Sequence, residues 1–265
     1  MGDRATLAII GGGNMGAAFV TGLLRGGFDP SGIAICEVSE ARRSALQTEF
    51  PDVPVVESPD SCSEAIIAVK PGDVASACRS AVKAGATRVL SIAAGVRLHS
   101  LTEACGATIK VVRAMPNTPA LVGQACTAFA ASANCAAADR EWARELLSAV
   151  GAVVELDETM LDAFTGLIGS GPAYVFYVAE ALRDAAVAEG FDPATAADVV
   201  SQLFVGAAAL LAREPANAAD LRRRVTSPNG TTAAGIASLD DDRVRDAFVS
   251  AVRAATKRSK ELGDA

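Results

Sequence analysis

Near its start the chain reads Thr6-Leu7-Ala8-Ile9-Ile10-Gly11-Gly12-Gly13-Asn14-Met15-Gly16, an apolar run that breaks into glycines before apolar residues resume. This pattern predicts a strand, a tight turn and a helix. Gly11, Gly13 and Gly16 have the G-x-G-x-x-G spacing of dinucleotide-binding turns, in which glycines permit the turn, the approach of a pyrophosphate and close helix packing. Because the phosphates bind at the helix N-terminus, Asn14 and Met15 belong to the same candidate site.

An acidic residue follows the second predicted strand. That strand spans residues 32–36 and ends at Glu37, about 20 residues after the last glycine, where such folds place an acid on the ribose hydroxyls. A carboxylate there repels a 2′-phosphate, which favours NADH. Ser39 and Arg42 form a phosphate site instead if Glu37 turns away, so NADH and NADPH both stay open as cofactors.

Composition and charge exclude several classes of protein. The chain has 265 residues, 51% of them hydrophobic but only 5% aromatic, and a formal net charge of −7. A nucleic-acid surface needs a basic face, so we expect no nucleic-acid partner. No uninterrupted apolar run approaches the roughly 20 residues of a membrane span, and no signal-peptide pattern is present. We expect a soluble, cytoplasmic protein with no membrane partner.

Cysteine and histidine usage argues against a metal site. Six cysteines are scattered without a C-x-x-C pair, and His99 is the only histidine. Zinc sites need close ligand pairs, so we expect buried free thiols and no metal. His99 lies in a predicted short helix and reads as structural, because a Ser-His-Asp hydrolase needs a G-x-S-x-G elbow, which the sequence lacks.

Short apolar runs alternate with helical patterns after the glycine turn. Predicted strands span residues 65–69, 88–92 and 109–113, and predicted helices span 39–50 and 73–84. This alternation predicts an α/β fold with a doubly wound parallel sheet. The strands end in Val69-Lys70-Pro71, Ala93-Ala94-Gly95 and Met115-Pro116-Asn117. These residues are either ordinary turn formers or, since ligands bind beyond the carboxyl ends of such strands, the lining of one crevice.

The pattern changes after about Glu155, because only helices are predicted from there on. They span residues 160–168, 173–189, 193–212, 218–225, 232–239 and 243–262. We therefore predict a dinucleotide-binding domain at 1–157 and an all-α domain at 158–265. The helices at 173–189 and 193–212 are apolar on more than one face, so protein must cover them. We predict a homodimer through the α domain.

Two helix starts in the α domain have unusual chemistry. The first is Gly169-Ser170-Gly171-Pro172-Ala173, which is either a helix cap or part of a site. The second is Val225-Thr226-Ser227-Pro228-Asn229-Gly230-Thr231-Thr232, a turn rich in hydroxyls that opens a helix. Hydroxyls and backbone N–H groups at a helix N-terminus can hold a small carboxylate.

Taken together, these blocks resemble the pyrroline-5-carboxylate reductase family over essentially the whole chain. The resemblance rests on the glycine turn, the strand ends, Arg113-Ala114-Met115-Pro116-Asn117-Thr118-Pro119-Ala120, the Gly169–Tyr174 block and the turn at 225–232. It implies a Rossmann-type domain followed by an all-α dimerisation domain. In the family the partner subunit completes the active site, and some members assemble into decamers.

The resemblance also implies a reaction, the reduction of the cyclic imine 1-pyrroline-5-carboxylate to L-proline by NADPH or NADH. It places the substrate carboxylate at Ser227, Asn229, Gly230 and Thr231, and the catalytic contact to the ring nitrogen at Thr232. The cofactor side comprises Gly11, Gly13, Asn14, Met15, Gly16, Glu37, Val69, Lys70, Pro71, Ala93, Ala94, Gly95, Pro116 and Asn117. An imine fits the sequence better than a ketone, because a carbonyl needs a positioned general acid and an imine can arrive protonated.

One departure and three alternatives remain open. The family usually has Gly-Gly after Ser-Pro, whereas this chain has Asn229-Gly230; asparagine tolerates positive φ, so we expect the turn to survive. Reductases of related cyclic imine acids are not distinguishable by sequence. The 3-hydroxyacid dehydrogenases need a lysine on the first helices of the α domain, and none stands between Lys110 and Lys257. A non-catalytic dinucleotide sensor has no use for an imine turn.

Overall fold

The computed structural model describes residues 6–213 and 217–263. The chain divides into two compact units. The first, called the sheet unit here, comprises residues up to Ser170 and those from Ala255 onward, and the second, the helical unit, comprises Gly171–Ala254. These units are groups of residues in contact, and the domain boundary expected between residues 157 and 158 stays a prediction.

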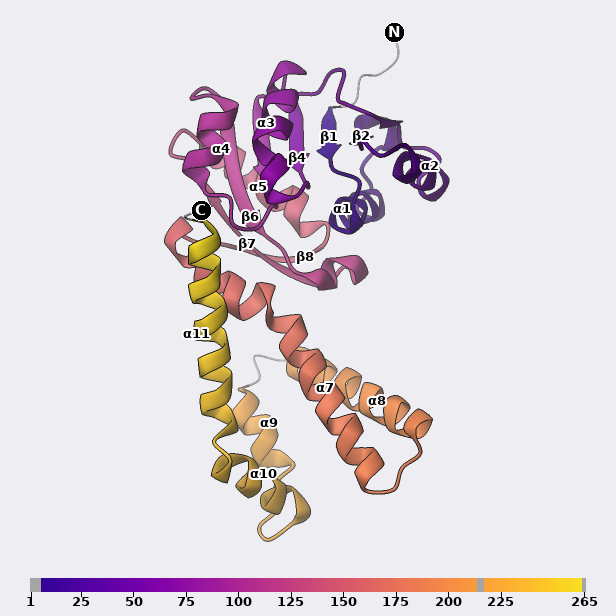
Figure 1. Cartoon of the computed structure of the whole chain (residues 1–265), viewed down its shortest axis with the longest axis vertical. Coiled ribbons are helices and arrows are strands. Elements are labelled where there is room, and N and C mark those ends of the chain that lie inside the picture. Colours follow the sequence, from indigo (N-terminus) through magenta and orange to yellow (C-terminus); the bar gives the residue numbers. More distant parts are fainter. Residues whose placement is uncertain (1–5, 214–216, 264–265) are drawn as a thin grey trace. The chain divides into compact units, whose positions relative to one another are not determined.

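The sheet unit is built on one eight-stranded sheet (Figure 1). Its order is β3-β2-β1-β4-β5-β6-β7-β8, and the first six strands run parallel. This confirms the predicted doubly wound sheet, with the strand order reversing between β1 and β4. The strands are β1 (Leu7–Ile10), β2 (Ile33–Cys36), β3 (Val55–Val56), β4 (Glu64–Ile67), β5 (Arg88–Ser91), β6 (Lys110–Met115), β7 (Ala125–Ala131) and β8 (Gly151–Glu155).

The strands β7 and β8 are not predicted by the sequence patterns above. β7 pairs antiparallel with β6, and β8 pairs parallel with β7. The direction reverses because only a short turn and the 3-10 helix Thr118–Val122 join β6 to β7, whereas a parallel return needs a crossover of a dozen or more residues. Helix α5 (Ala137–Ser148) provides that crossover between β7 and β8.

Helices cover both faces of the sheet, and each face has its own core (Figure 1). Side chains alternate along each strand, so Ile9 and Ile66 face α1 (Asn14–Arg25), α2 (Glu40–Glu49) and α5, while Ile10 and Ile67 face α3 (Val74–Lys83) and α4 (Leu98–Cys105). These strands are apolar throughout because both faces are buried. Because these strands run parallel, the carboxyl ends of β1, β4, β5 and β6 lie at one edge of the sheet.

Short helical segments complete the sheet unit. Three further 3-10 turns span Pro30–Gly32, Pro71–Asp73 and Glu158–Met160. Helix α6 (Leu161–Phe164) continues directly into a π-helix, Thr165–Gly169, so the single helix predicted at 160–168 is in fact a helix with a π-helical end. The last turns of α11 (Val244–Gly263) also belong to the sheet unit.

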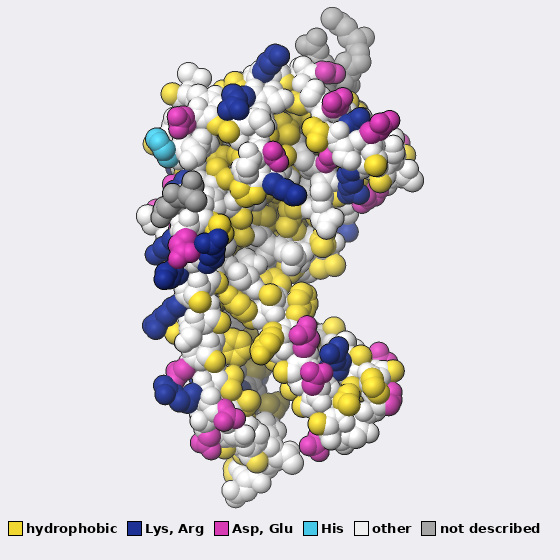
Figure 2. All heavy atoms as spheres, viewed as in Figure 1, with side chains coloured by type: hydrophobic (Ala, Val, Ile, Leu, Met, Phe, Trp, Pro, Cys, Tyr) yellow, Lys and Arg dark blue, Asp and Glu magenta, His cyan; other side chains and the backbone are white. Residues whose placement is uncertain are grey.

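The helical unit contains the helices expected from the sequence. They are α7 (Gly171–Ala188), α8 (Pro193–Ala212), α9 (Ala218–Arg224), α10 (Thr231–Asp241) and the first part of α11. Among the described residues of this unit, only Ala196 and Val200 are buried. Figure 2 shows many hydrophobic side chains at its surface. The helical unit thus has almost no core of its own.

One described helix, α8, is long and apolar enough to cross a membrane when judged by length and composition alone. Its mean hydropathy over the most apolar 18 residues is 1.6, and 11% of that window is buried. Asp198, Ser201 and Gln202 interrupt the apolar sequence, as expected for a helix that is covered by protein. Length and hydropathy do not distinguish these two environments.

Candidate active site

The glycine turn between β1 and α1 has the geometry that the motif predicts. Gly11 has φ of 107°, and a Cβ there would lie 2.5 Å from the carbonyl oxygen of Ala68. A Cβ on Gly16 would overlap the carbonyl oxygen of Gly11. Only glycine fits these two positions, because Gly11 packs against the end of β4 and Gly16 packs against the backbone of Gly11.

Gly13 is different, because its open side meets no neighbouring atom. A Cβ there would have nothing within 4 Å, and Gly13 is the N-cap of α1 with no side-chain capping bond. The first N–H groups of α1, beginning at Asn14 and Met15, therefore face an open space. A helix N-terminus of this kind attracts anions, and the missing side chain leaves room for a pyrophosphate.

Glu37 lies at the end of β2 and is held by the backbone on both sides. Its Oε2 accepts a hydrogen bond from the N–H of Gly12 at 3.0 Å, and its Oε1 accepts one from the N–H of Ser39 at 2.9 Å. Each carboxylate oxygen keeps a lone pair for a further donor. The structure thus joins the predicted acid to the glycine turn.

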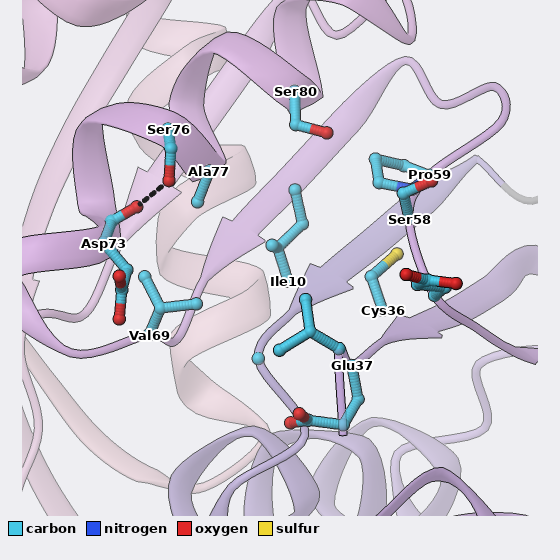
Figure 3. Close-up of a pocket in the computed structure, with 13 residues that line it drawn as sticks. Ile10, Cys36, Glu37, Ser58, Pro59, Val69, Asp73, Ser76, Ala77 and Ser80 are labelled. Carbon is cyan, nitrogen blue, oxygen red and sulfur yellow. Dashed lines mark hydrogen bonds between the residues drawn. The ribbon is translucent and has the colours of Figure 1, made fainter. Parts of the chain in front are cut away.

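Glu37 and Gly11 line a cavity of about 380 Å³ beyond the ends of β1 and β2, which we call the β1–β2 cavity (Figure 3). Burial raises the pKa of the Cys36 thiol in this cavity to about 12, and neighbouring Cys62 and Asp60 add to the rise. Cys36 is therefore a neutral wall residue at neutral pH. The lining comprises Ile10, Gly11, Cys36, Glu37, Val38, Glu57, Ser58, Pro59, Val69, Asp73, Ser76, Ala77 and Ser80.

A second hollow, of about 280 Å³, lies beyond the ends of β4, β5 and β6, and we call it the β4–β6 crevice. It contains one residue or more from each of the three predicted strand ends. The lining is mainly apolar and suits a flat ring that must be shielded from water. It comprises Met15, Ala68, Val69, Ile92, Ala93, Ala94, Met115, Pro116, Asn117, Thr118 and Gly169.

Six of the predicted cofactor residues line neither hollow; Gly13, Asn14 and Gly16 belong to the glycine turn described above, and the other three are Lys70, Pro71 and Gly95. Lys70 and Pro71 are exposed at the start of a 3-10 turn. Gly95 has φ of 76° and faces the end of α11, where a Cβ would be 3.6 Å from Cβ of Leu262. Their roles in binding stay predictions, and the structure gives Gly95 a packing reason of its own.

Asn117 lines the crevice, but its amide is bonded to backbone. Its Nδ2 donates to the carbonyl of Ile168 at 3.1 Å, and its Oδ1 accepts from the N–H of Cys126 at 3.0 Å. The side chain therefore joins the end of β6, the start of β7 and the π-helix. Sequence reasoning assigned Asn117 to the cofactor and missed this positioning role, for which an asparagine before Thr-Pro is only a weak signal.

The π-helix explains part of the glycine-rich block at 169–173. Gly169 packs against Met115 in the crevice, where a Cβ would be 2.9 Å from the Met115 methyl group. The N–H of Ser170 bonds to the carbonyl of Thr165 at 2.9 Å. π-Helical turns are frequent at functional sites, and this one brings Gly169 into the wall of the crevice.

A buried polar network holds the loop that follows β5 and was not predicted. Asp162 is 3% exposed and accepts from the Oγ of Ser259 at 2.8 Å and from Arg97 Nη1 at 3.5 Å. Arg97 Nε also donates to the carbonyl of Gly263 at 3.2 Å. These contacts fix the end of α11 beside the Ala93–Gly95 loop. They join residues far apart in sequence, which a motif search does not find.

The hydroxyl-rich turn in the helical unit has the expected strained residue. Asn229 has φ of 59°, so this position does take the left-handed conformation that asparagine tolerates. A Cβ on Gly230 would overlap the Oγ of Ser227, which is why glycine follows. Gly230 is the N-cap of α10 with no side-chain capping bond, so this helix N-terminus is open beside Thr231 and Thr232.

The cysteines offer no metal site among the residues that the structure describes. Five of the six are buried and Cys126 is half-buried, all as free thiols. Within residues 6–213 and 217–263, no three histidine, cysteine, aspartate or glutamate side chains are grouped to hold a metal ion. His99 is exposed in α4, away from both hollows. The polar chemistry therefore lies in the two helix N-termini and Glu37.

Comparisons with known proteins identify relatives of both parts of the chain. Residues 158–262 match the family model for pyrroline-5-carboxylate reductase dimerisation. Residues 6–95 match the model for NADP oxidoreductase, coenzyme F420-dependent. Among solved structures, a pyrroline-5-carboxylate reductase from Coxiella burnetii has a TM-score of 0.91 and 31% identity, covering 98% of this chain and 99% of that one.

Curated relatives match over nearly the full length. A pyrroline-5-carboxylate reductase from Synechocystis is 40% identical, covering 97% of this chain and 98% of the relative. One from Methanosarcina acetivorans is 39% identical, covering 98% and 99%. The reductase structure from Plasmodium falciparum, described with NADP bound, has a TM-score of 0.83 and 26% identity over 98% of each chain. On this evidence of sequence and fold, the chain belongs to the pyrroline-5-carboxylate reductase family.

Proposed function

We propose that this chain reduces 1-pyrroline-5-carboxylate to L-proline with NADPH or NADH, the last step of proline biosynthesis. The observation that carries this proposal is full-length membership of the reductase family, at 40% identity to one curated member. The glycine turn is also intact, as is the hydroxyl-rich turn at residues 225–232, which we call the carboxylate turn from here on. A dinucleotide sensor would need the first turn but not the second.

The described residues fit a dinucleotide in an extended form. We propose that the open N-terminus of α1 at Gly13 binds the pyrophosphate, that the β1–β2 cavity takes the adenosine, and that the β4–β6 crevice takes the nicotinamide. When bound, the reduced nicotinamide supplies a hydride to the imine carbon. The apolar wall around Ala93 and Pro116 excludes water from that ring.

The carboxylate turn positions the other reactant. Ser227 and Thr231 offer hydroxyls, and the uncapped N-terminus of α10 at Gly230 offers backbone N–H groups. We propose that Thr232 hydrogen-bonds the ring nitrogen. As the hydride adds to carbon, the C=N electron pair moves to the protonated nitrogen and gives a neutral amine, so no separate acid is needed. Most of the rate then comes from orienting two bound reactants.

We also propose a homodimer through the α domain, with the domain boundary at 157/158. The dimerisation model begins at residue 158, and the helical unit leaves large apolar side chains such as Phe176 and Leu203 more than half exposed. A second copy covers such a surface without lipid, including the apolar face of α8. This supports a cytoplasmic enzyme, and assembly beyond a dimer, into a decamer, stays a proposal.

The direct test is oxidation of NADH or NADPH, followed by absorbance, when the five-membered imine acid is added to the purified protein. We expect oxidation with stoichiometric formation of proline. Oxidation with the six-membered imine acid alone would assign a related substrate. No oxidation of either cofactor, although dinucleotide binds, would overturn the reductase proposal.

A substitution at Thr232 tests the mechanism. We expect Thr232→Ala to lower kcat/KM for the imine by about tenfold or more, as for loss of one hydrogen bond in a closed site. Ser238→Ala is the matched control, because it removes an exposed hydroxyl from the same helix. Unchanged kinetics in Thr232→Ala would remove this residue from the mechanism.

A further inference from the structure

We propose that this enzyme discriminates against NADPH and uses NADH, because the β1–β2 cavity presents a fixed carboxylate, that of Glu37, where a 2′-phosphate would lie. The proposal rests on the proposed function, which leaves the cofactor open. It runs against the expectation from relatives, since the model matching residues 6–95 is described as an NADP oxidoreductase and one related structure has NADP bound. The selecting residue is Glu37.

The first observation is that Glu37 is not free to turn away. Both carboxylate oxygens accept backbone N–H bonds, one from the glycine turn at Gly12 and one from Ser39. This holds the side chain at the mouth of the cavity (Figure 3). The remaining lone pairs are acceptors only, so they suit ribose hydroxyls, which donate, and repel a phosphate, which does not.

The second observation is that the whole cavity is acidic. Glu57 and Asp73 line it together with Glu37, and none of the described residues in its lining is a lysine or arginine. A 2′-phosphate carries about two negative charges at neutral pH. In this cavity it would therefore face an excess of negative charge. The ribose of NADH adds no charge, and the apolar side chains of Ile10, Val38 and Val69 offer a surface for the adenine.

The third observation concerns the two arginines that follow β2. Arg42 Nε donates to the carbonyl of Gly12 at 2.7 Å, and Arg43 Nη1 donates to the carbonyls of Glu37 and Val38, both at 2.8 Å. Both guanidinium groups thus bind backbone beside the cavity and neither lines it. A phosphate site formed by Ser39 and Arg42 would therefore have to draw on the Nη groups of Arg42, outside the lining of the cavity.

The test is calorimetric binding of NAD⁺ and NADP⁺ to the full chain, without any imine. We expect the dissociation constant for NADP⁺ to exceed that for NAD⁺ by about tenfold or more at low ionic strength, and the gap to narrow as salt screens the repulsion. Equal affinities, tighter binding of NADP⁺ or binding of neither dinucleotide would overturn the proposal.

Two variants assign the effect to its residues. We expect Glu37→Gln to lower the ratio of the dissociation constant for NADP⁺ to that for NAD⁺ by about tenfold, because the substitution removes the charge and keeps the shape of the side chain. Glu57→Gln leaves the Glu37 contacts intact and should narrow the ratio by about two- to threefold, which keeps the test valid if Glu37→Gln does not fold. Glu40→Gln is the matched control on the exposed first turn of α2 and should leave the ratio unchanged. If the ratio of dissociation constants is unchanged in both cavity variants, the acidic side chains of the cavity are not the cause of the discrimination.

The proposal about cofactor choice and the proposal about the reductase reaction can be refuted independently of each other. Imine reduction without cofactor discrimination would refute the NADH proposal and leave the reductase in place. Discrimination between NAD⁺ and NADP⁺ without imine reduction would refute the reductase and leave the cavity assignment in place. The ratio of kcat/KM for NADH and NADPH then provides a second measure in the active enzyme, where it should follow the binding ratio.

Discussion

The sheet unit and the helical unit differ in how fully each buries its own apolar residues. In the sheet unit, Phe19, Ile66 and Phe129 are completely buried between the sheet and its helices. In the helical unit, Phe176 is 62% exposed and Leu203 is 56% exposed. Both parts are rich in alanine, valine and leucine, so composition does not separate them. The arrangement does: one unit has its own core, and the other needs apolar contacts from outside itself.

This contrast separates the unit that has the cofactor hollows from the unit that has the exposed apolar faces. The sheet unit can hold the glycine turn and both hollows rigidly, because the strands that end there are buried on both faces. The helical unit carries the carboxylate turn on helices whose apolar faces are not satisfied within it. Exposed apolar faces of this kind are expected for a segment that matches a dimerisation model.

The largest effect is expected from a charge placed on the exposed apolar face of the helical unit. Phe176→Glu removes two phenyl rings from a symmetric dimer, each worth about 1.5–3 kcal/mol, so the dissociation constant should rise at least about a hundredfold. Light scattering should show the mass falling from at least twice 26.9 kDa towards 26.9 kDa. Wild-type protein that is monomeric at micromolar concentration would contradict the dimer.

The control for this prediction lies in the sheet unit. Val122 is 68% exposed at the end of a 3-10 turn, so it matches Phe176 in exposure but not in unit. We expect Val122→Glu to leave the mass unchanged. A similar loss of mass in both variants would mean that exposed apolar residues of the two units serve the same interface.

Within the sheet unit, two glycines of one turn should separate folding from binding. Gly16→Ala places a methyl group on the carbonyl oxygen of Gly11, and we expect a loss of about 3 kcal/mol in the free energy of unfolding. Gly13→Ala meets no atom, so it should cost less than about 1 kcal/mol and raise the dissociation constant of the dinucleotide by about tenfold.

Urea unfolding followed by the fluorescence of Trp142 measures the first quantity, because this single tryptophan lies in α5 of the sheet unit. Calorimetry measures the second. Equal destabilisation by the two variants would show that the close packing at Gly16 is relieved by movement of the turn. Unaltered binding by Gly13→Ala would show that the phosphates do not bind at α1.

A smaller effect should distinguish a buried charge of α6 that contacts α11 from an exposed charge within α11. Asp162→Asn replaces a buried acceptor of Ser259 and Arg97 by an amide that can satisfy only one of them, so we expect a loss of about 1–3 kcal/mol. Asp246→Asn removes an exposed partner of Arg243 and should cost less than about 0.5 kcal/mol. Urea unfolding with Trp142 as the probe compares the two, and a larger effect at Asp246 would contradict this ranking.

The features predicted correctly from sequence are those fixed by local chemistry. The glycine turn, the strand ends that line the crevice, Glu37 at the end of β2 and the helix that begins after the hydroxyl-rich turn depend on residues close together in the chain. Positive φ at Asn229 belongs to the same class, because it follows from the residue type and its neighbours.

The features that escaped prediction depend on distant partners. β7 has the sequence Ala125–Ala131, in which four of seven residues are alanine, a residue depleted in strands, and it becomes a strand because β6 and β8 pair with it. Asn117 and Asp162 are ordinary polar residues until the fold brings Ile168 and Ser259 beside them. No local pattern contains that information.

The smallest effect is expected at Asn229, a position of the carboxylate turn where the resemblance to the family implies a glycine. Glycine adopts positive φ readily, so Asn229→Gly should keep the start of α10 intact. The substitution removes an exposed amide that can donate to the substrate carboxylate, so we expect KM for the imine to rise about two- to fivefold while kcat changes less. Asn217→Gly, at the N-cap of α9, is the matched control and should leave KM unchanged. A larger change in kcat than in KM would mean that this turn shapes the reacting geometry and does more than bind the carboxylate.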